Sequence, residues 1–424
     1  MQDTNIERYL INDDIFNKIN KQFISLDFDD VKNHNRHLNE VFEKLINAMR
    51  QQNSLFDKTF QRIVPAGSYY KKTRVGQPEE YDLNFVINLP FKEKDIQFIS
   101  DRPGYIKIRT TWKDRDMLHT TLKLEQKALR ELNSFIDNKS YLNQDKFRFW
   151  MEGILSKVAN KTSQSNRIVL SNYISIMIKK TGPAFTLSFE VSGKSIDIDL
   201  VPVLAFSNRN PPPKCSKLSI LKKYEPDSRY WFAVPKPLNN SKAKFNDAPH
   251  RYWRLCFYEF EKDILDGHGR AKPIIRHLKK FRDTQNWKTI ASYYIETLCL
   301  NELDIFQISN KKSFTSLFFT MLQKLREAFR KGTITYYWDK NLNLLEHIGS
   351  DEMRCMTGRI NHIIQNIERT IANDKYAIAK CICEYLFFNE ICKYRDRHKH
   401  NIFMQKLAIR KLIIFIIYLS KYKY

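Results

Sequence analysis

The chain has 424 residues, 42% of them hydrophobic and 28% charged, which is enough for two lobes with sizeable hydrophobic cores. Its 71 basic and 47 acidic residues give a formal net charge of +24, which attracts polyanions such as nucleic acid. The low content of glycine (11 residues) and proline (14 residues) argues against long disordered tracts. Seven scattered cysteines, none with zinc-finger spacing, fit reduced thiols better than a disulfide framework or a structural zinc.

Neither end of the chain predicts an export or membrane segment. Residues 1–5 have neither the basic start nor the apolar core of a signal peptide. The apolar run 412–419 is far too short to cross a bilayer, so we interpret it as a buried terminal helix. We therefore expect a cytoplasmic protein with no membrane partner.

The first predicted element is an amphipathic helix over residues 36–50. Its apolar residues recur at spacings of three and one, as on one face of a helix. They are Leu38, Val41, Phe42, Leu45, Ile46 and Met49. This helix precedes Gly67-Ser68 and is expected to pack on a sheet.

A short basic loop after Gly67-Ser68 leads into a strand over residues 81–89, whose odd positions are apolar. Burial of that face turns Glu80 and Asp82 to the opposite face, about 7 Å apart along the strand. Two carboxylates on one face can converge on a hard divalent cation such as Mg²⁺. Taken alone, such acids more often form a solvated strand face.

A second acidic strand lies in the predicted hairpin over residues 185–205. Ile196, Ile198 and Leu200 alternate with Asp197 and Asp199, so the two aspartates share a face and either can supply a third carboxylate. Before this hairpin we expect a strand over 105–111 and a mainly helical, basic stretch over 120–180.

The composition then changes, with Pro211-Pro212-Pro213 and few aliphatic residues indicating a long connection between lobes. From Trp253 onward the pattern is helical to the end. We therefore expect an α+β, bilobal protein with its active site in a cleft: a mixed β-sheet lobe with a long N-terminal helix (residues 1–206), a connection (207–250) and a C-terminal helical lobe (251–424).

The order Gly-Ser, acid-apolar-acid strand and later acidic strand resembles the nucleotidyltransferase superfamily typified by DNA polymerase beta. That resemblance implies three carboxylate ligands, Glu80, Asp82 and Asp199, for two Mg²⁺ (or Mn²⁺) ions, with Asp197 in reserve. Gly67 and Ser68 would offer backbone N–H groups and a hydroxyl to nucleotide phosphates.

Further stretches narrow the family. The order of four stretches resembles that in cyclic GMP-AMP synthase and its animal receptor-like relatives, of the male-abnormal-21-like nucleotidyltransferase family. The stretches are Gly67-Ser68-Tyr69-Tyr70, Val234-Pro235-Lys236, Trp253-Arg254-Leu255-Cys256-Phe257 and Ser292-Tyr293-Tyr294. The resemblance implies a nucleotidyltransferase fold and runs from about residue 36 into the 340s. It implies base recognition by Arg254, triphosphate contacts by Lys279 and Ser292, and base stacking by Tyr293. From the residues alone, each of these is more readily a surface or core residue.

One position departs from the pattern of vertebrate cyclic GMP-AMP synthase. His268 resembles a zinc-binding histidine, but no cysteine cluster follows it, so the family's zinc module is expected to be missing, as in the insect members. The basic residues that we expect to bind nucleic acid are Lys71, Lys72, Arg74, Arg270, Lys272, Arg276 and Lys280.

These features favour a sensor in innate antiviral immunity that makes a cyclic dinucleotide of the cyclic GMP-AMP type from ATP and GTP. Double-stranded RNA is expected to activate it in preference to DNA, and a ligand-induced homodimer stays open. The alternatives are an oligoadenylate-synthase-like enzyme with a linear product, and a non-catalytic nucleic-acid-binding or scaffold member of the family.

Overall fold

The computed structural model describes residues 6–24, 28–76, 80–110, 125–160, 167–171, 174–181, 184–191, 194–236 and 247–382. Ten strands within these ranges form one mixed sheet. They are β1 (Phe60–Pro65), β2 (Glu80–Ile87), β3 (Ile96–Ile99), β4 (Tyr105–Thr110), β5 (Arg167–Ser171), β6 (Ile174–Thr181), β7 (Ala184–Val191), β8 (Lys194–Ser207), β9 (Tyr230–Val234) and β10 (Tyr252–Cys256). A small separate hairpin pairs β11 (Thr335–Tyr336) with β12 (Asp339–Asn343).

Strand β8 is the centre of the sheet because three strands pair with it. Strands β7 and β9 follow one another along one edge, both antiparallel to β8. Strand β2 runs parallel to β8 along the other edge, from Glu80 opposite Asp197 to Ile87 opposite Leu204. The parallel pair places two strands that lie more than a hundred residues apart side by side.

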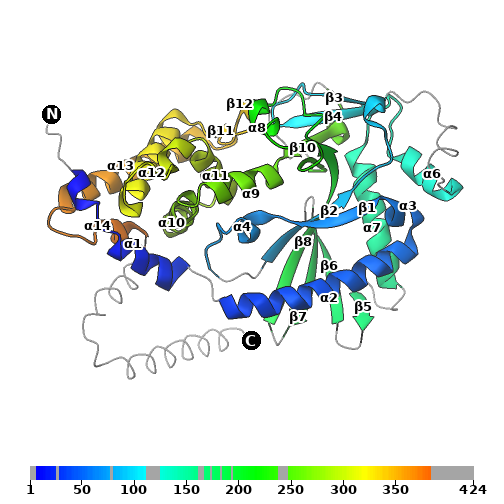
Figure 1. Cartoon of the computed structure of the whole chain (residues 1–424), viewed down its shortest axis with the longest axis horizontal. Coiled ribbons are helices and arrows are strands. Elements are labelled where there is room, and N and C mark those ends of the chain that lie inside the picture. Colours follow the sequence, from blue (N-terminus) through cyan, green and yellow to red (C-terminus); the bar gives the residue numbers. More distant parts are fainter. Residues whose placement is uncertain are drawn as a thin grey trace.

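Helices cover the sheet and continue beyond it (Figure 1). The long α2 runs beside the sheet and packs on α7, while α10 to α14 gather together away from the sheet, on the left of the view. The helices are α1 (Asp14–Ile19), α2 (Phe28–Gln52), α3 (Ser54–Thr59), α4 (Gly67–Tyr70), α6 (Gln126–Ser134), α7 (Gln144–Asn160), α8 (Leu218–Leu221), α9 (Tyr258–Gly267), α10 (Ala271–Thr284), α11 (Ser292–Leu300), α12 (Phe314–Lys331), α13 (Ser350–Thr370) and α14 (Ala377–Ile382). We call α10–α14 the helical lobe and the ten-stranded sheet with α2, α3, α6 and α7 the sheet lobe.

The shorter elements are 3₁₀ and π turns. They are η1 (Ile6–Tyr9), η2 (Asn20–Ile24), η3 (Glu93–Asp95), η4 (Pro249–Arg251) and η5 (Leu303–Phe306).

The hydrophobic pattern explains the packing of the main elements. Val41, Phe42, Leu45 and Met49 of α2 are buried, as the helical spacing predicts. The apolar positions of β2, including Tyr81, Leu83 and Phe85, are buried as well. These side chains belong to one core that extends from the sheet into α10–α13 without a break. The structure confirms the expected α+β class.

One expectation about secondary structure is incomplete, and another is wrong. The stretch 120–180 is helical through α6 and α7 but then forms the strands β5 and β6, where alternating Ile174, Ile176 and Ile178 are typical of a strand. The region after Trp253 is not helical throughout, because β10 pairs with β4 and β9 inside the main sheet. The error at β10 arises because this short strand is stabilised by pairing with β4, far away in the sequence.

The N-terminal residues Ile6–Ile24 pack on the helical lobe. The Asp13 carboxylate accepts the backbone N–H groups of Phe314 and Thr315 at 3.0 and 2.9 Å, at the start of α12. The Phe16 ring stacks on His277 with ring centroids 3.6 Å apart. The expected boundaries at residues 206 and 250 stay predictions.

Searching the described residues for a helix long and apolar enough to span a membrane finds none. The apolar run 412–419, Cys383 and Cys392 lie outside the described residues.

Candidate active site

The parallel pairing of β2 with β8 places Asp82 directly beside Asp199. Neighbouring strands lie about 4.8 Å apart, so two aspartates in register on one face have their carboxylates close together. Both side chains are half-buried. Thr186 on β7 donates its hydroxyl to Asp199 Oδ1 at 2.6 Å, which holds that carboxylate from the other edge of β8.

The electrostatics of this pair favour a cation. Burial raises the pKa of the Asp82 carboxyl, the neighbouring Asp199 raises it further, and Arg74 and Lys71 only partly oppose them. Two like charges in a partly desolvated place repel each other, and a divalent ion between them would remove that cost. The oxygen donor set is the one that Mg²⁺ or Mn²⁺ prefers, so these residues fit such a metal.

The other two acids form a second pair in the same register. The backbone of Glu80, at the start of β2, lies opposite Asp197 on β8, and the Asp197 side chain is half-buried. The Glu80 side chain lies outside the described residues. Asp199 is thus the one of the two β8 aspartates that pairs with Asp82, while the metal role of Glu80 remains a prediction.

Gly67 and Ser68 begin α4, immediately after β1, and the Gly67 backbone lies against the Asp82 carboxylate. The Ala66 N–H donates to the Asp82 carbonyl at 2.8 Å. Gly67 has φ +72°, and a Cβ added there would lie 1.8 Å from Asp82 Oδ2. Only glycine allows this approach, so the turn and the carboxylate form one unit.

A cleft of about 1470 Å³ opens over this unit and is lined by both lobes. Most of the nucleotide-binding and catalytic residues predicted from the sequence lie on its walls. They are Gly67, Ser68, Asp82, Arg254, Lys279, Ser292 and Tyr293. Asp199 lies next to Asp82 but is not itself part of the lining.

Arg254, at the far wall of the cleft, is held between two aromatic rings. Its guanidinium lies 5.2 Å from the Tyr105 ring centroid and 5.1 Å from that of Tyr336. Gly104, with φ +73°, leaves space for it, because a Cβ there would lie 2.9 Å from Arg254 Nη1. Cation–π contacts of this kind stabilise the guanidinium at this place, and Arg254 lines the cleft.

The two predicted cations Lys71 and Lys279 are not on an exposed surface. The Lys71 ammonium lies 2.6 Å from Glu261 and 3.1 Å from Glu296, and its side chain is 5% exposed. The Lys279 ammonium lies 2.5 Å from Glu296, and its side chain is 3% exposed. Sequence reasoning missed both glutamates, although Glu296 is the lone acid in the apolar helix α11, which is a usable signal.

Ser292 and Tyr293 start α11 at the edge of the cleft. The Ser292 hydroxyl accepts from Arg282 Nη1 at 3.0 Å, and the Tyr293 hydroxyl donates to Glu261 at 2.6 Å. Arg282 also lines the cleft and was not predicted.

The remaining predicted basic residues divide into three sets. Arg270 and Lys272 lie at the start of α10 and have partners within the chain. Arg270 donates hydrogen bonds to the carbonyls of Gln307, Asn310 and Lys312, and Lys272 forms an ion pair with Asp266. Lys72 is exposed, Lys280 is half-exposed on α10, and Arg276 donates to the Lys72 carbonyl at 3.1 Å. Arg74 is half-buried and lines the cleft near Asp82.

His268 follows α9, and its Nδ1 lies 2.8 Å from the carbonyl of Ile264. Among the described side chains, which do not include Glu80, no group of three or more His, Cys, Asp or Glu could hold a metal ion.

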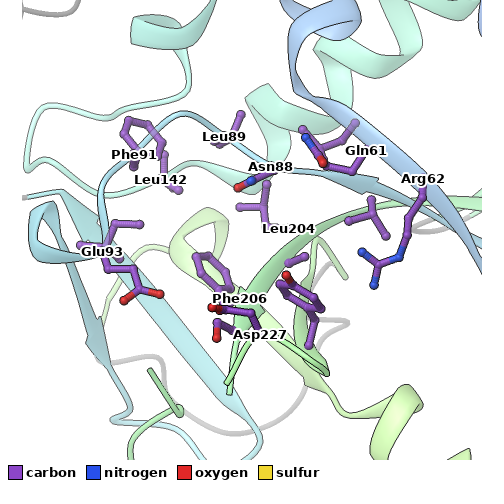
Figure 2. A pocket seen from close by; sticks show the side chains of 16 residues that line it. Gln61, Arg62, Asn88, Leu89, Phe91, Glu93, Leu142, Leu204, Phe206 and Asp227 are labelled. Atoms are coloured by element: carbon purple, nitrogen blue, oxygen red, sulfur yellow. The ribbon is translucent and has the colours of Figure 1, made fainter. Parts of the chain in front are cut away.

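A second, smaller cavity of about 280 Å³ lies at the other end of β2 and β8 (Figure 2). Leu89, Phe91 and Leu204 line it, with Arg62 and Asp227 at its rim. None of the predicted site residues is among the described side chains around it. The larger cleft is therefore the candidate active site.

A paired carboxylate site beside a Gly-Ser turn, facing a cleft between a mixed sheet and a helical lobe, is the arrangement of a nucleotidyltransferase. The comparisons agree. Residues 69–267 match the Mab-21 protein nucleotidyltransferase domain, and residues 270–362 match the Mab-21 protein HhH/H2TH-like domain. The chain belongs to the Mab-21 nucleotidyltransferase family, as the sequence resemblance predicted.

Three similar proteins carry the name "Cyclic GMP-AMP synthase-like receptor". That of Microplitis demolitor is 38% identical over 85% of this chain and 66% of its own length, so the match spans just under two thirds of that relative. Those of Trichogramma pretiosum and Aethina tumida are 32% and 31% identical, over 87% and 88% of this chain and 75% and 92% of their own lengths.

The contact between Gly67 and Asp82 predicts a large effect of one methyl group. Gly67→Ala should lower the free energy of unfolding by about 1–3 kcal/mol, because φ is positive and the Cβ meets the carboxylate. Gly153→Ala is the control, since nothing lies within 4 Å of a Cβ there in α7. It should stabilise the chain by up to about 1 kcal/mol. Urea unfolding measures both, and equal stabilities for the two variants would contradict the geometry.

The Glu296 contacts predict a pH-dependent stability. Burial alone raises the pKa of Glu296, but Lys71 and Lys279 outweigh it and lower that pKa to about 2, from 4.5. The lowered pKa means that this stabilisation is present above pH 4.5 and is lost as the pH falls towards 2. We expect Glu296→Gln to cost about 3 kcal/mol at pH 7 and clearly less at pH 3. Urea unfolding at both pH values checks this, and an equal cost at both would refute it.

Proposed function

We propose that this chain is a nucleic-acid-activated nucleotidyltransferase that makes a cyclic dinucleotide of the cyclic GMP-AMP type from ATP and GTP. The observation that carries the proposal is Asp82 in register with Asp199 and in contact with the Gly67 turn, at the floor of the cleft. The names of the relatives support the cyclic product. The setting that we propose is cytoplasmic antiviral defence.

Each cleft residue has a role that its position supports. The N–H groups of the Gly67 turn and the Ser68 hydroxyl bind terminal phosphates next to the carboxylates. Arg254, fixed between Tyr105 and Tyr336, binds a base edge by hydrogen bonds. Tyr293, at the cleft wall, stacks on a base, and Ser292 contacts the triphosphate.

The reaction joins a ribose hydroxyl to an α-phosphate. The hydroxyl oxygen forms the new P–O bond, its proton is lost, and the bond to pyrophosphate breaks with pyrophosphate leaving. Two bound Mg²⁺ or Mn²⁺ ions would lower the pKa of the attacking hydroxyl and neutralise charge on the triphosphate. Glu80, Asp82 and Asp199 would hold them, while the cleft orients the two nucleotides. A second round of the same chemistry closes the ring.

The activating ligand that we propose is double-stranded RNA, bound by Lys72, Arg276 and Lys280. Arg276 joins α10 to the segment after α4 through the Lys72 carbonyl, so a phosphate backbone on this face contacts both lobes. A-form RNA is recognised mainly through its phosphates and shape, which suits a face of lysine and arginine. A ligand-induced homodimer remains compatible with this proposal.

The proposal is tested by incubating the chain with Mg²⁺, radiolabelled ATP and GTP, with and without duplex RNA. Wild type should form a phosphatase-resistant product only with RNA, and Asp82→Asn should lose at least about 10³-fold in rate, since metal contacts supply about 4 kcal/mol.

Because the pKa of the Asp82 carboxyl is raised, the ionised group costs stability at neutral pH. The melting temperature of Asp82→Asn should therefore not fall.

Other outcomes of this assay decide between the alternative functions. A phosphatase-sensitive product would indicate a linear oligonucleotide and contradict the cyclic synthase. RNA binding with no turnover in Mg²⁺ or Mn²⁺ would favour a non-catalytic member of the family. Equal turnover by wild type and Asp82→Asn would overturn the assignment of the site itself, and activation by duplex DNA but not RNA would overturn the choice of ligand.

A further inference from the structure

Five buried polar residues connect the Gly67 turn to the opposite wall of the cleft. They are Lys71 and Thr73 on the segment after α4, and Glu261, Lys279 and Glu296 on α9, α10 and α11, and we call them the tether. Each of these residues is at most 5% exposed. Lys71 lies four positions after Gly67, so the tether begins where the phosphate-binding turn ends.

Glu296 binds the segment at two points. One carboxylate oxygen lies 3.1 Å from Lys71 Nζ. The other accepts from the Thr73 hydroxyl at 2.7 Å and from Lys279 Nζ at 2.5 Å. Thr73 in turn donates its backbone N–H to the Ser68 carbonyl at 2.9 Å. Two hydrogen bonds therefore lead from the Ser68 backbone, through Thr73, to helix α11.

Lys279 has no hydrogen left for a phosphate in this arrangement. Its ammonium donates to Glu296 Oε1, to the Thr73 carbonyl at 3.1 Å and to the Thr73 hydroxyl oxygen at 3.3 Å. An ammonium group has three N–H donors, and all three are used. The sequence resemblance assigned Lys279 to the triphosphate, whereas its contacts here are those of a residue that positions the segment.

Glu261 extends the same set of contacts to the base-binding wall. One of its oxygens lies 2.6 Å from Lys71 Nζ, and the other accepts from the Tyr293 hydroxyl at 2.6 Å and from the Trp338 indole at 3.0 Å. The turn that contacts Asp82 and the tyrosine expected to stack on a base are thus held by one carboxylate.

The chemistry of the tether differs from that of an ordinary lobe contact. Two lysines and two glutamates balance in charge, but burying them costs desolvation free energy that an apolar contact of the same volume would avoid. Such a network fixes the relative position of the segments that it joins, because each hydrogen bond is satisfied in only one relative placement of its two groups. The Gly67 turn lies against the Asp82 carboxylate, so its placement affects the proposed metal site.

We propose that the tether positions the Gly67–Thr73 segment against Asp82, and that Thr73, Lys71, Lys279, Glu261 and Glu296 are positioning residues for nucleotidyl transfer. This inference rests on the proposed function for its catalytic consequence and on the contacts above for its geometry. Loss of one contact lets the segment move away from the carboxylate, so the metal requirement and the turnover change while the fold persists.

Thr73 allows a matched test. Thr73→Val keeps the shape and removes the hydroxyl, and Thr73→Ser keeps the hydroxyl. We expect Thr73→Val to lower kcat by on the order of 10–10²-fold and to raise the Mg²⁺ concentration for half-maximal rate, because small displacements of reacting groups cost that much. Thr73→Ser should stay within about threefold of wild type. Glu296→Gln should resemble Thr73→Val, and Glu327→Gln, which breaks an exposed ion pair with Arg330, should resemble wild type.

Hydrogen exchange over residues 67–76 supplies a readout that does not depend on activity. Exchange there should be faster in Thr73→Val and Glu296→Gln than in wild type, Thr73→Ser and Glu327→Gln. Unchanged exchange together with an unchanged Mg²⁺ requirement in Thr73→Val and Glu296→Gln would overturn the tether. Failure of wild type to turn over nucleotides would instead overturn the proposed function, and the exchange data would still decide whether the tether holds the segment.

Discussion

The parallel pairing of β2 with β8 is the constraint on which the rest of this structure depends. It joins strands more than a hundred residues apart and sets Asp82 beside Asp199. Because side chains alternate along a strand, a slip of one residue would turn Asp199 into the core and bring Leu200 or Ile198 to its place. The buried Tyr81, Leu83 and Ile198 on the opposite face prevent that slip, so the apolar core determines the position of the acids.

The cleft is completed by contacts between lobes rather than by the sheet alone. The Gly67 turn touches Asp82 from the sheet side, and Lys71 and Thr73 join that turn to α9, α10 and α11. Arg254 belongs to β10 and therefore to the sheet, yet the Tyr336 that holds it comes from the hairpin after α12. The site is thus built from residues of both lobes.

Much of this site could be predicted from local patterns. The alternation around Asp82 and Asp199 showed which face each acid occupies, and the ordered matches placed Arg254 and Tyr293 in a cleft. Local periodicity does not pair Lys71 with Glu296, because the two residues are 225 positions apart, and the one local signal is that Glu296 is the lone acid of the apolar helix α11. For the same reason β10 was not predicted as a strand, because it pairs with β4 far away in the sequence. Strands β5 and β6 pair in a local hairpin, and the alternation of Ile174, Ile176 and Ile178 was a signal that could have predicted them.

The central claim is that Asp82 and Asp199 together bind a divalent cation. Electron paramagnetic resonance of Mn²⁺ titrated into the full chain with a non-hydrolysable ATP analogue tests it without any need for turnover. Wild type should remove the free Mn²⁺ signal at lower concentrations than Asp199→Asn, while Asp227→Asn, at the rim of the smaller cavity, should match wild type. Equal Mn²⁺ binding by wild type and Asp199→Asn would contradict the account.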